Sequence, residues 1–215
     1  MSKRYRDRYE AGRQLARHLE GYAGLEDAAV FALPRGGVPV GYEVARALHA
    51  PLDVCVVRKL GVPGHEELAM GAIAGANVLV LNQQVIERLE ISEQAIEAAV
   101  KREQQELARR EATYREGRPP LSAAGRVAIL VDDGLATGST MRAAVRAVRQ
   151  ENPARLIVAV PVGAADTCEQ FRREGVEVAC PLVPEAFYAV GMWYEDFTQT
   201  TDEEIRELLH AGTPA

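Results

Sequence analysis

The segment from Val127 to Met141, with the sequence VAILVDDGLATGSTM, constrains the fold of this chain more than any other stretch. It begins with five consecutive apolar residues, which indicate a short strand buried on both faces, as in parallel sheets. Two adjacent acids, Asp132 and Asp133, follow, and then a turn rich in glycine and hydroxyl groups. Apolar residues at helical spacing, from Met141 to Val148, predict a helix after the turn.

The turn between this strand and this helix suits a sugar phosphate. A helix N-terminus offers unpaired N–H groups and a positive dipole end to a phosphate. Gly138 lets a backbone approach closely, and Thr137, Ser139 and Thr140 add hydroxyl donors. The acidic pair would repel a phosphate, but ionised carboxylates accept hydrogen bonds from vicinal hydroxyls. A phosphate and a diol on one small molecule suggest a ribose 5-phosphate.

A simpler interpretation needs no ligand: Thr137 or Ser139 caps the helix, and the two aspartates are solvated. A Walker A loop does not fit, because the two glycines are four residues apart and no lysine follows the second.

The same segment resembles the 5-phosphoribosyl-1-diphosphate (PRPP) signature of type I phosphoribosyltransferases, in which an apolar strand precedes two acids and a small T-G-S/G-T loop. The resemblance implies that the acids hold the ribose 2- and 3-hydroxyls and that the loop holds the 5-phosphate. The residues assigned in this way are Asp132, Asp133, Gly134, Ala136, Thr137, Gly138, Ser139 and Thr140.

A second glycine-containing loop follows the short predicted strand from Val30 to Leu33. Its sequence is Pro34-Arg35-Gly36-Gly37, and consecutive glycines allow exposed amides to point at an anion. A plain tight turn is the alternative. The resemblance implies a diphosphate site at Arg35, Gly36 and Gly37, with a non-proline cis peptide between Arg35 and Gly36 or nearby.

A third strand end carries cations. The strand predicted from Asp53 to Val57 leads into Arg58 and Lys59, and the glycines and proline that follow predict a mobile loop over residues 58–65. The resemblance implies the flexible loop that closes over PRPP, with Lys59 at the diphosphate. His65 is either a proton carrier or a solvent-exposed side chain. Strands at 69–74 and 78–81, around a Gly-Ala-Asn turn, predict a small hairpin.

Strands and helices alternate along the rest of the chain, with further strands at 156–160 and 176–180. This pattern predicts an α/β fold: a doubly wound, mostly parallel sheet with helices on both faces. We expect a single domain over residues 1–215, with a helical insertion at about 83–118. The candidate loops all follow strands, so one edge of the sheet can hold one ligand.

The last part of the chain, residues 181–215, is predicted to form a small hood. It gathers aromatic residues, which form either ordinary core or, as the resemblance implies, a stacking surface for a nucleobase. The candidate stacking residues are Tyr188, Trp193 and Tyr194.

Composition limits the classes of function. A formal charge of −6 and a pI near 5.4 argue against nonspecific nucleic-acid binding and leave a local basic site open. A helix is predicted from residue 5 to 19, and the cluster of Lys3, Arg4, Arg6 and Arg8 around its start is expected to be a solvated face. The three cysteines indicate free thiols in a reducing compartment. With no apolar run near 18 residues, no membrane span is expected, and the predicted location is the cytoplasm.

The resemblance implies transfer of the 5-phosphoribosyl group from PRPP to a nitrogen acceptor, with release of diphosphate. Arg35, Arg58, Lys59, Asp132 and Asp133 are the expected catalytic residues. Mg²⁺ is the expected cofactor, held by substrate and water, with Asp132 or Asp133 as the candidate protein contact through water. The expected partners are PRPP and a nucleobase. The sequence does not decide whether the chain forms a homo-oligomer. The alternatives are a PRPP- or nucleotide-sensing regulator and a phosphatase or kinase.

The acceptor is constrained by one departure from the family pattern. Hypoxanthine–guanine enzymes of this family carry a third acid three residues after the second, where it handles the purine N7 proton. Ala136 occupies that position here, so 6-oxopurine salvage by that route is not expected. Glu185 and Glu195 are the candidate substitutes.

Overall fold

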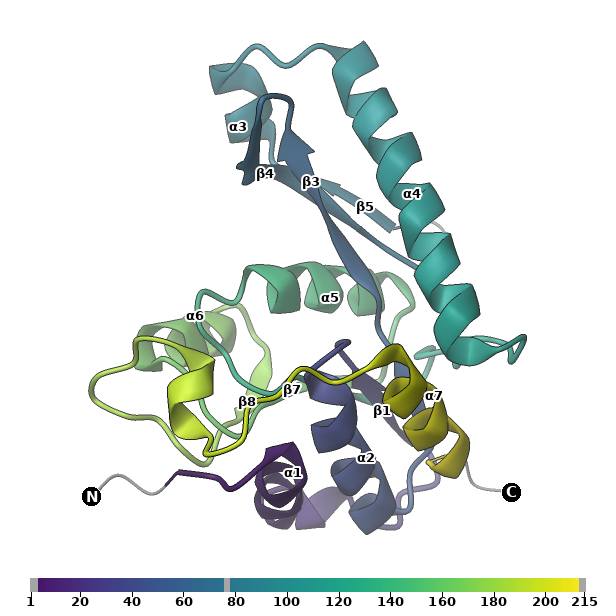
Figure 1. Ribbon diagram of the computed structural model, residues 1–215, viewed down its shortest axis with the longest axis vertical. Coiled ribbons are helices and arrows are strands. Elements are labelled where there is room, and N and C mark those ends of the chain that lie inside the picture. The colour runs from purple at the N-terminus through teal and green to yellow at the C-terminus, as the bar shows by residue number, and fades with distance from the viewer. Residues whose placement is uncertain (1–3, 76–77, 213–215) are drawn as a thin grey trace.

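The computed structural model describes residues 4–75 and 78–212. Its chain forms a five-stranded parallel sheet, a three-stranded antiparallel sheet, and helices packed on both (Figure 1). The helices are α1 (Arg8–Arg17), α2 (Gly37–Leu48), α3 (Gln83–Arg88), α4 (Glu93–Arg115), α5 (Ser139–Gln150), α6 (Ala165–Arg173) and α7 (Asp202–Ala211), with short 3-10 turns at Glu20–Tyr22 and Val190–Trp193. The strands are β1 (Ala28–Ala32), β2 (Leu52–Val54), β3 (Val57–Val62), β4 (His65–Ala74), β5 (Val78–Leu81), β6 (Val127–Val131), β7 (Arg155–Ala159) and β8 (Glu177–Ala179).

The central sheet has the strand order β2-β1-β6-β7-β8, and every neighbouring pair is parallel. The chain winds in one direction from β1 to β2 and in the other from β6 to β8. The predicted doubly wound α/β fold is therefore confirmed. Its direction switches between β1 and β6, which is where sheets of this kind bind ligands, just beyond the carboxyl ends of the strands.

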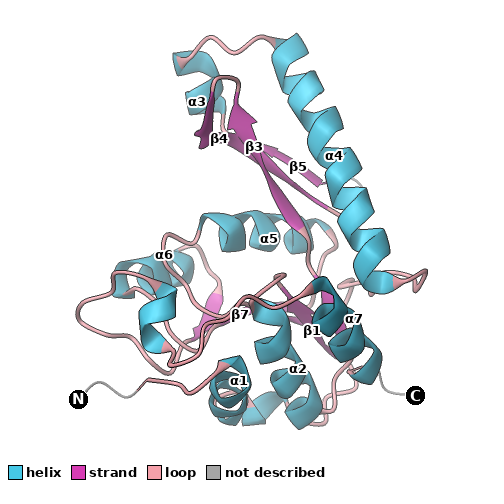
Figure 2. Cartoon of the chain, in the orientation of Figure 1, coloured by secondary structure: helices cyan, strands magenta, loops and turns pink. Residues whose placement is uncertain are grey.

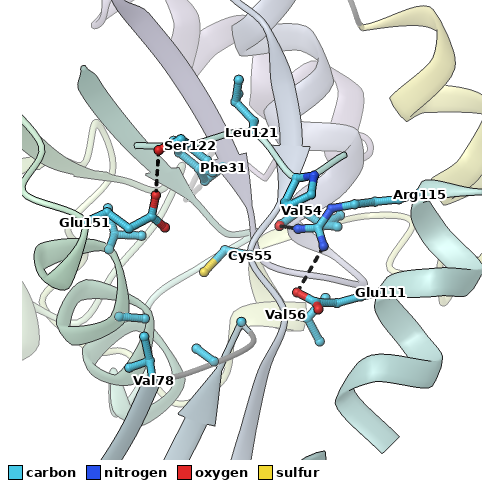
Figure 3. A pocket seen from close by; sticks show the side chains of 15 residues that line it. Phe31, Val54, Cys55, Val56, Val78, Glu111, Arg115, Leu121, Ser122 and Glu151 are labelled. Carbon is cyan, nitrogen blue, oxygen red and sulfur yellow. Dashed lines mark hydrogen bonds and ion pairs between the residues drawn. The ribbon is translucent and has the colours of Figure 1, made fainter. Parts of the chain in front are cut away.

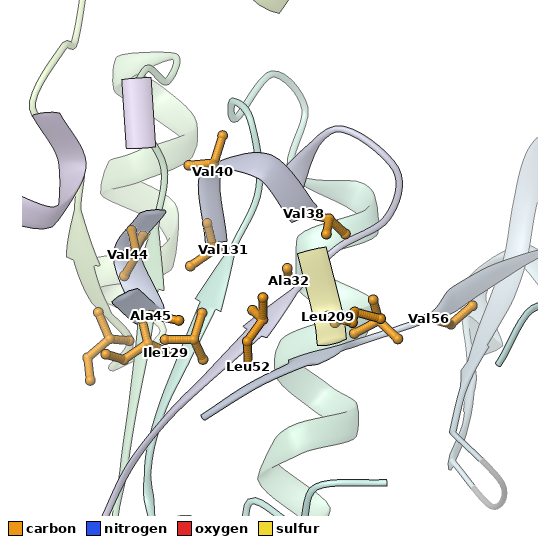
Figure 4. Close-up of a cluster of buried hydrophobic side chains, with 14 of the residues drawn as sticks. Ala32, Val38, Val40, Val44, Ala45, Leu52, Val56, Ile129, Val131 and Leu209 are labelled. Carbon is orange, nitrogen blue, oxygen red and sulfur yellow. The ribbon is translucent and has the colours of Figure 1, made fainter. Parts of the chain in front are cut away.

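Alternate residues of each central strand enter two separate cores. In β6, Ile129 and Val131 pack with α1, α2 and α7 on one face, whereas Ala128 and Leu130 pack with α5 and α6 on the other. Figure 4 shows the first of these cores, with Val131 among the side chains of α2 and Leu209 reaching in from α7. Burial on both faces explains the unbroken apolar run of this strand.

The segment from β3 to α4, residues 57–115, forms a distinct layer that we call the hairpin–helix unit. Its three strands pair in the order β3-β4-β5, and α4 runs along them, away from the central sheet (Figure 2). Helices α3 and α4 fall within the range expected for a helical insertion. The Ala76 and Asn77 of the predicted Gly-Ala-Asn turn lie outside the described residues.

The mobile loop predicted over residues 58–65 is instead a β-hairpin, and this prediction was wrong. Strand β3 continues to Val62, the chain turns at Pro63 and Gly64, and β4 starts at His65. Leu60 and Val62 alternate into the core beneath α4, with 0% and 4% exposure. That period of two, which favours a strand, outweighs the turn-forming residues around it.

Candidate functional site

Two loops meet at the switch point of the central sheet. Strands β1 and β6 pair in register, Ala32 opposite Val131, so the residues that follow them start side by side. The Leu33 amide donates a hydrogen bond to the Val131 carbonyl at 2.8 Å and carries the pairing one residue further. The loops at 34–37 and 132–140 together form what we call the core cradle.

The two loops of the core cradle touch at Gly36. A Cβ atom on Gly36 would lie 2.0 Å from Asp133 Oδ2, so only glycine permits this approach. The peptide between Pro34 and Arg35 is cis, one bond before the Arg35–Gly36 bond, so it lies in the region where the resemblance implied a non-proline cis peptide. The Gly37 amide donates to the Leu33 carbonyl at 3.0 Å as α2 begins.

The two aspartates have different surroundings. Oδ1 of Asp132 accepts a hydrogen bond from the Asp133 amide at 2.9 Å, and Oδ2 of Asp133 accepts one from Arg8 Nε at 2.9 Å. Burial raises the pKa of Asp132 well above its usual value, and the neighbouring charge of Asp133 adds to the shift. Burial also raises the pKa of Asp133, but Arg8 opposes that rise. Asp132 is therefore the carboxylate with no compensating cation in contact among the described residues.

The turn at 134–140 has the geometry of an anion site. Gly138 takes a left-handed conformation, φ 71°, at the start of α5, and the first amides of that helix have no partner within it. Thr137 and Ser139 are exposed beside it. The turn is braced from below, where Thr167 Oγ1 donates to the Ala136 carbonyl at 2.6 Å. A hollow of about 200 Å³ is lined by residues 132–141 and Val190.

The three expected cations are placed differently. Arg35 forms an ion pair with Asp202 of α7 at 3.2 Å. Arg58 points from β3 to α4, where it pairs with Glu103 at 2.6 Å. Lys59, on the opposite face of β3, is exposed. Arg35 thus lies in a loop of the core cradle. Arg58 does not face the cradle, and it could do so only after its ion pair with Glu103 breaks.

The hood contacts the core cradle at two residues, one that lines the hollow and one that supports the acidic pair. Val190 packs against Gly134, where an added Cβ would approach it to 2.5 Å. Tyr188 is 82% exposed, and Trp193 stacks near Phe187 with ring centroids 6.5 Å apart. Tyr194 is only 3% exposed, and its hydroxyl donates to the Asp133 carbonyl at 2.6 Å. Tyr194 therefore supports the acidic pair from beneath and presents no free face for stacking.

Comparisons with known proteins agree with this geometry. The family model described as "Phosphoribosyl transferase domain" matches residues 3–189. The chain belongs to the phosphoribosyltransferase family. It is 45% identical over 207 residues to the Mycobacterium tuberculosis protein named "Putative phosphoribosyl transferase Rv0571c", covering 96% of this chain and 46% of that protein. The chain thus spans about half the length of the curated relatives it matches.

Solved structures show similarity of the fold as well as of the sequence. TT1426 from Thermus thermophilus superposes with a TM-score of 0.85 and 42% identity, covering 98% of this chain and 100% of that one. The AQ2163 protein from Aquifex aeolicus is 12% identical, with a TM-score of 0.52 over 96% of this chain and 86% of its own, and shows the shared fold alone. The type I phosphoribosyltransferase resemblance drawn from the sequence is confirmed.

One residue of the candidate site was not predicted from the sequence. Arg8 was expected on a solvated face, but it is only 9% exposed and contacts Asp133, so that expectation was wrong for Arg8. Arg4 and Arg6 are exposed. The signal was present in the spacing: Arg8 shares its helix face with Ala11 and Leu15, which are both fully buried.

The groups proposed as proton carriers lie at the surface of the phosphoribosyltransferase fold. His65, Glu185 and Glu195 are all exposed. Among the described residues, no hydrogen bond or ion pair joins any of them to the core cradle. Their roles stay predictions.

A second cavity, of about 360 Å³, lies away from the core cradle, where the central sheet meets the hairpin–helix unit (Figure 3). It is lined mainly by apolar side chains, with Glu111, Arg115 and Glu151 at its margins. Arg115 is committed to Asp53 at 3.0 Å and to Glu111 at 3.1 Å. The residues that line this cavity include none of the predicted site residues.

The donor groups fit Mg²⁺ only in a limited way. Within residues 4–75 and 78–212, no cluster of three or more His, Cys, Asp or Glu side chains is arranged to bind a metal. Arg8 pairs with Asp133, so Asp132 is the carboxylate of the pair that has no cation in contact among the described residues. That arrangement suits a magnesium ion held mostly by substrate oxygens and water. In the same described part of the chain, no helix has the length and apolarity to cross a membrane.

Proposed function

We propose that this chain is a phosphoribosyltransferase that transfers the 5-phosphoribosyl group of PRPP to a nitrogen acceptor and releases diphosphate. One observation carries the proposal: the 34–37 loop and the 132–140 loop meet at the sheet's switch point, with Gly36 against Asp133. A ligand at this junction can place a diphosphate at one loop and a ribose 5-phosphate at the other. PRPP carries both groups on adjacent parts of one molecule.

Each part of PRPP has a proposed partner in the core cradle. Asp132, with support from Asp133, accepts hydrogen bonds from the ribose hydroxyls. The backbone amides and hydroxyls of residues 134–140 hold the 5-phosphate at the N-terminus of α5. Arg35 and the amides of Gly36 and Gly37 hold the diphosphate, and Lys59 approaches from the hairpin–helix unit. Arg58 joins them only after exchanging Glu103 for the ligand.

The reaction needs stabilisation of a leaving group more than it needs a nucleophile on the protein. As diphosphate departs, the ribose C1 gains oxocarbenium-like character, and the acceptor nitrogen attacks it. Arg35, Lys59 and the amides of 36–37 stabilise the departing negative charge. Magnesium, with Asp132 or Asp133 as its protein contact through water, would supply positive charge that offsets the negative charge of the departing diphosphate. We propose no covalent intermediate with the protein.

The acceptor is proposed to be a nucleobase other than a 6-oxopurine. Ala136 is exposed beside Thr137 and offers no carboxylate for the N7 proton. The base would lie against the hood, where Val190 lines the hollow and Tyr188 is free to move onto a ring. We place this activity in the cytoplasm, with PRPP and the base as its small-molecule partners.

The test is diphosphate release from PRPP with magnesium and a panel of adenine, guanine, hypoxanthine, uracil and orotate. We expect release with one base outside the 6-oxopurines, and none from an Asp132→Asn/Asp133→Asn double variant. Fast turnover of guanine or hypoxanthine that survives Glu185→Gln and Glu195→Gln would overturn the acceptor assignment. Absence of PRPP binding by the wild-type chain would overturn the function.

A PRPP-sensing regulator is the second candidate, and one observation favours it. The two arginines expected among the catalytic residues both pair with carboxylates, Arg35 with Asp202 and Arg58 with Glu103. Such an arrangement allows ligand binding to rearrange ion pairs without turnover. Saturable PRPP binding with no diphosphate release from any base in the panel would select this candidate.

A further inference from the structure

Arg8 lies at the junction of segments that are distant in the sequence. Its Nε donates to Asp133 Oδ2 at 2.9 Å, and its Nη1 donates to the Thr198 carbonyl at 2.7 Å. Its guanidinium carbon lies 4.0 Å from the centre of the Phe197 ring. One side chain from the start of α1 therefore binds both the acidic pair and the hood.

The same side chain also borders the diphosphate loop. A Cβ on Gly36 would lie 3.1 Å from Arg8 Nε and 2.0 Å from Asp133 Oδ2. The ion pair thus fills the space beside Gly36, and its position fixes how closely the 34–37 loop can approach β6. Side-chain exposures of 10% for Arg8 and 15% for Asp133 keep the pair largely out of water.

Backbone contacts reinforce this connection between the first and last parts of the described chain. Tyr5 and Tyr194 form a parallel bridge, and the Glu195 and Asp196 amides donate to the Tyr5 and Arg6 carbonyls at 2.8 and 2.9 Å. Tyr194 in turn donates its hydroxyl to the Asp133 carbonyl. Asp133 is therefore held at its side chain by α1 and at its backbone by the hood.

We propose that Arg8 is a positioning residue: by fixing the Asp133 carboxylate, it holds the 34–37 loop, the acidic pair and the hood in the arrangement that binds PRPP. The PRPP part of this inference rests on the proposed function. Asp133 is then the fixed member of the pair, and Asp132 is the one that meets the ribose. No contact between Arg8 and the ligand is required.

The guanidinium shape matters as much as its charge. Two of its nitrogens serve two acceptors in different directions while its plane faces Phe197. A lysine ammonium is a compact point charge without this fork. Arg8→Lys should therefore keep the positive charge but preserve only part of the arrangement of the two loops and the hood.

The first experiment measures hydrogen–deuterium exchange in the ligand-free chain, comparing wild type, Arg8→Gln and a matched control, Arg13→Gln. Arg13 also lies on α1 and pairs with a buried carboxylate, Glu43, at 2.8 Å, but away from the core cradle. We expect faster exchange in peptides covering 33–40, 131–137 and 194–200 for Arg8→Gln only. Unchanged exchange in those peptides would overturn the positioning role.

The second experiment measures the affinity of the same variants for PRPP with magnesium by calorimetry. We expect Arg8→Gln to weaken binding roughly 10- to 100-fold, the range seen when a group orienting a ligating side chain is removed. Arg8→Lys should lie between that variant and wild type, and Arg13→Gln should match wild type. Wild-type affinity in Arg8→Gln would overturn the inference while leaving the proposed function intact.

The two experiments also distinguish failure of the proposed function from failure of a variant to fold. If wild type does not bind PRPP but the exchange response to Arg8→Gln appears, the proposed function fails and the positioning role stands. If Arg8→Gln does not fold, an Arg8→Gln/Asp133→Asn variant removes the unpaired buried charge. Faster exchange of 33–40 and 194–200 in that folded double variant supports the role, and unchanged exchange contradicts it.

Discussion

The core cradle and the hairpin–helix unit both carry residues assigned to PRPP, yet different forces hold them. The cradle follows strands that are buried on both faces, and Ile129 and Leu130 of β6 are fully buried. The hairpin–helix unit has one packed face, and its helix α4 carries ion pairs at its surface, such as Glu106 with Arg109 and Arg110. Surface pairs of this kind contribute little to stability.

This difference indicates a division of labour. The acids and the proposed phosphate turn, which the proposed function requires in a fixed geometry, are placed by the buried sheet. The cation Arg58 is held by the Glu103 carboxylate, which a diphosphate would replace in the proposed function. We therefore expect the hairpin–helix unit to be the part that adjusts when a ligand binds.

The largest expected effect is on stability, and it compares how tightly side chains pack in the two regions. Ile129→Ala should lower the free energy of unfolding by about 2–5 kcal/mol, because it empties a site enclosed by β1, β7 and α2. Ile96→Ala, which removes the same atoms from a half-buried position on α4, should cost about 1 kcal/mol. Urea unfolding of both variants measures the two values, and equal losses would contradict the contrast.

The next effect concerns the acidic pair. Asp132→Asn should weaken PRPP binding by about 1.5–3 kcal/mol, because a charge-assisted hydrogen bond to ribose is lost. Asp166→Asn, an exposed position in the first turn of α6, provides the same change of charge away from the cradle. Calorimetric affinities that match in the two variants would remove Asp132 from the ribose site.

A smaller effect is expected where an acid competes with the diphosphate. Asp202→Asn should free Arg35 and strengthen diphosphate binding by about 0.2–1 kcal/mol, the usual value of an exposed pair. Glu203→Gln makes the same charge change in the same helical turn, at an exposed residue. Competition binding of inorganic diphosphate compares them, and the idea fails if both variants bind it alike.

The weakest expected effect is on the pH dependence of stability, which should have opposite signs for one carboxylate in each region. Hydrogen bonds from Arg109 and then Arg110 lower the pKa of Glu106 from 4.5 to about 2, so its stabilisation should be lost as the pH falls between these values. The raised pKa of Asp132 does the opposite, so its penalty should grow as the pH rises above 3.8. Unfolding from pH 2 to 7 should show Glu106→Gln converging with wild type in acid and Asp132→Asn diverging from it toward neutral pH.

The sequence predicts those features whose signals are local. A buried strand, two acids and a glycine turn occupy consecutive residues, so the candidate phosphate turn is predicted from them, and the alternation of short strand and helix patterns along the chain predicts the fold class. The hairpin at 57–74 was missed, because Gly61, Pro63 and Gly64 suggested a loop and the partner helix α4 lies far along the chain. The strand period of Leu60 and Val62 becomes decisive only when that helix is present to bury them.

The supports of the site could not be predicted in the same way. Arg8 meets Asp133 across 125 residues, and Tyr194 reaches it across 61. Nothing in the neighbourhood of Arg8 along the sequence distinguishes it from Arg4 or Arg6 except its place on the apolar stripe. A tyrosine of the hood that was expected to stack a base proves to be buried beneath the acids.

The contact of Arg8 with Thr198 spans 190 residues, and this separation has a consequence for the order of events during synthesis. The strands and loops of the core cradle leave the ribosome long before residue 198 does. Contacts of such high sequence separation form late, after the chain between them has folded. A nascent chain should therefore display the sheet early and acquire its affinity for PRPP only once the segment around Thr198 has emerged.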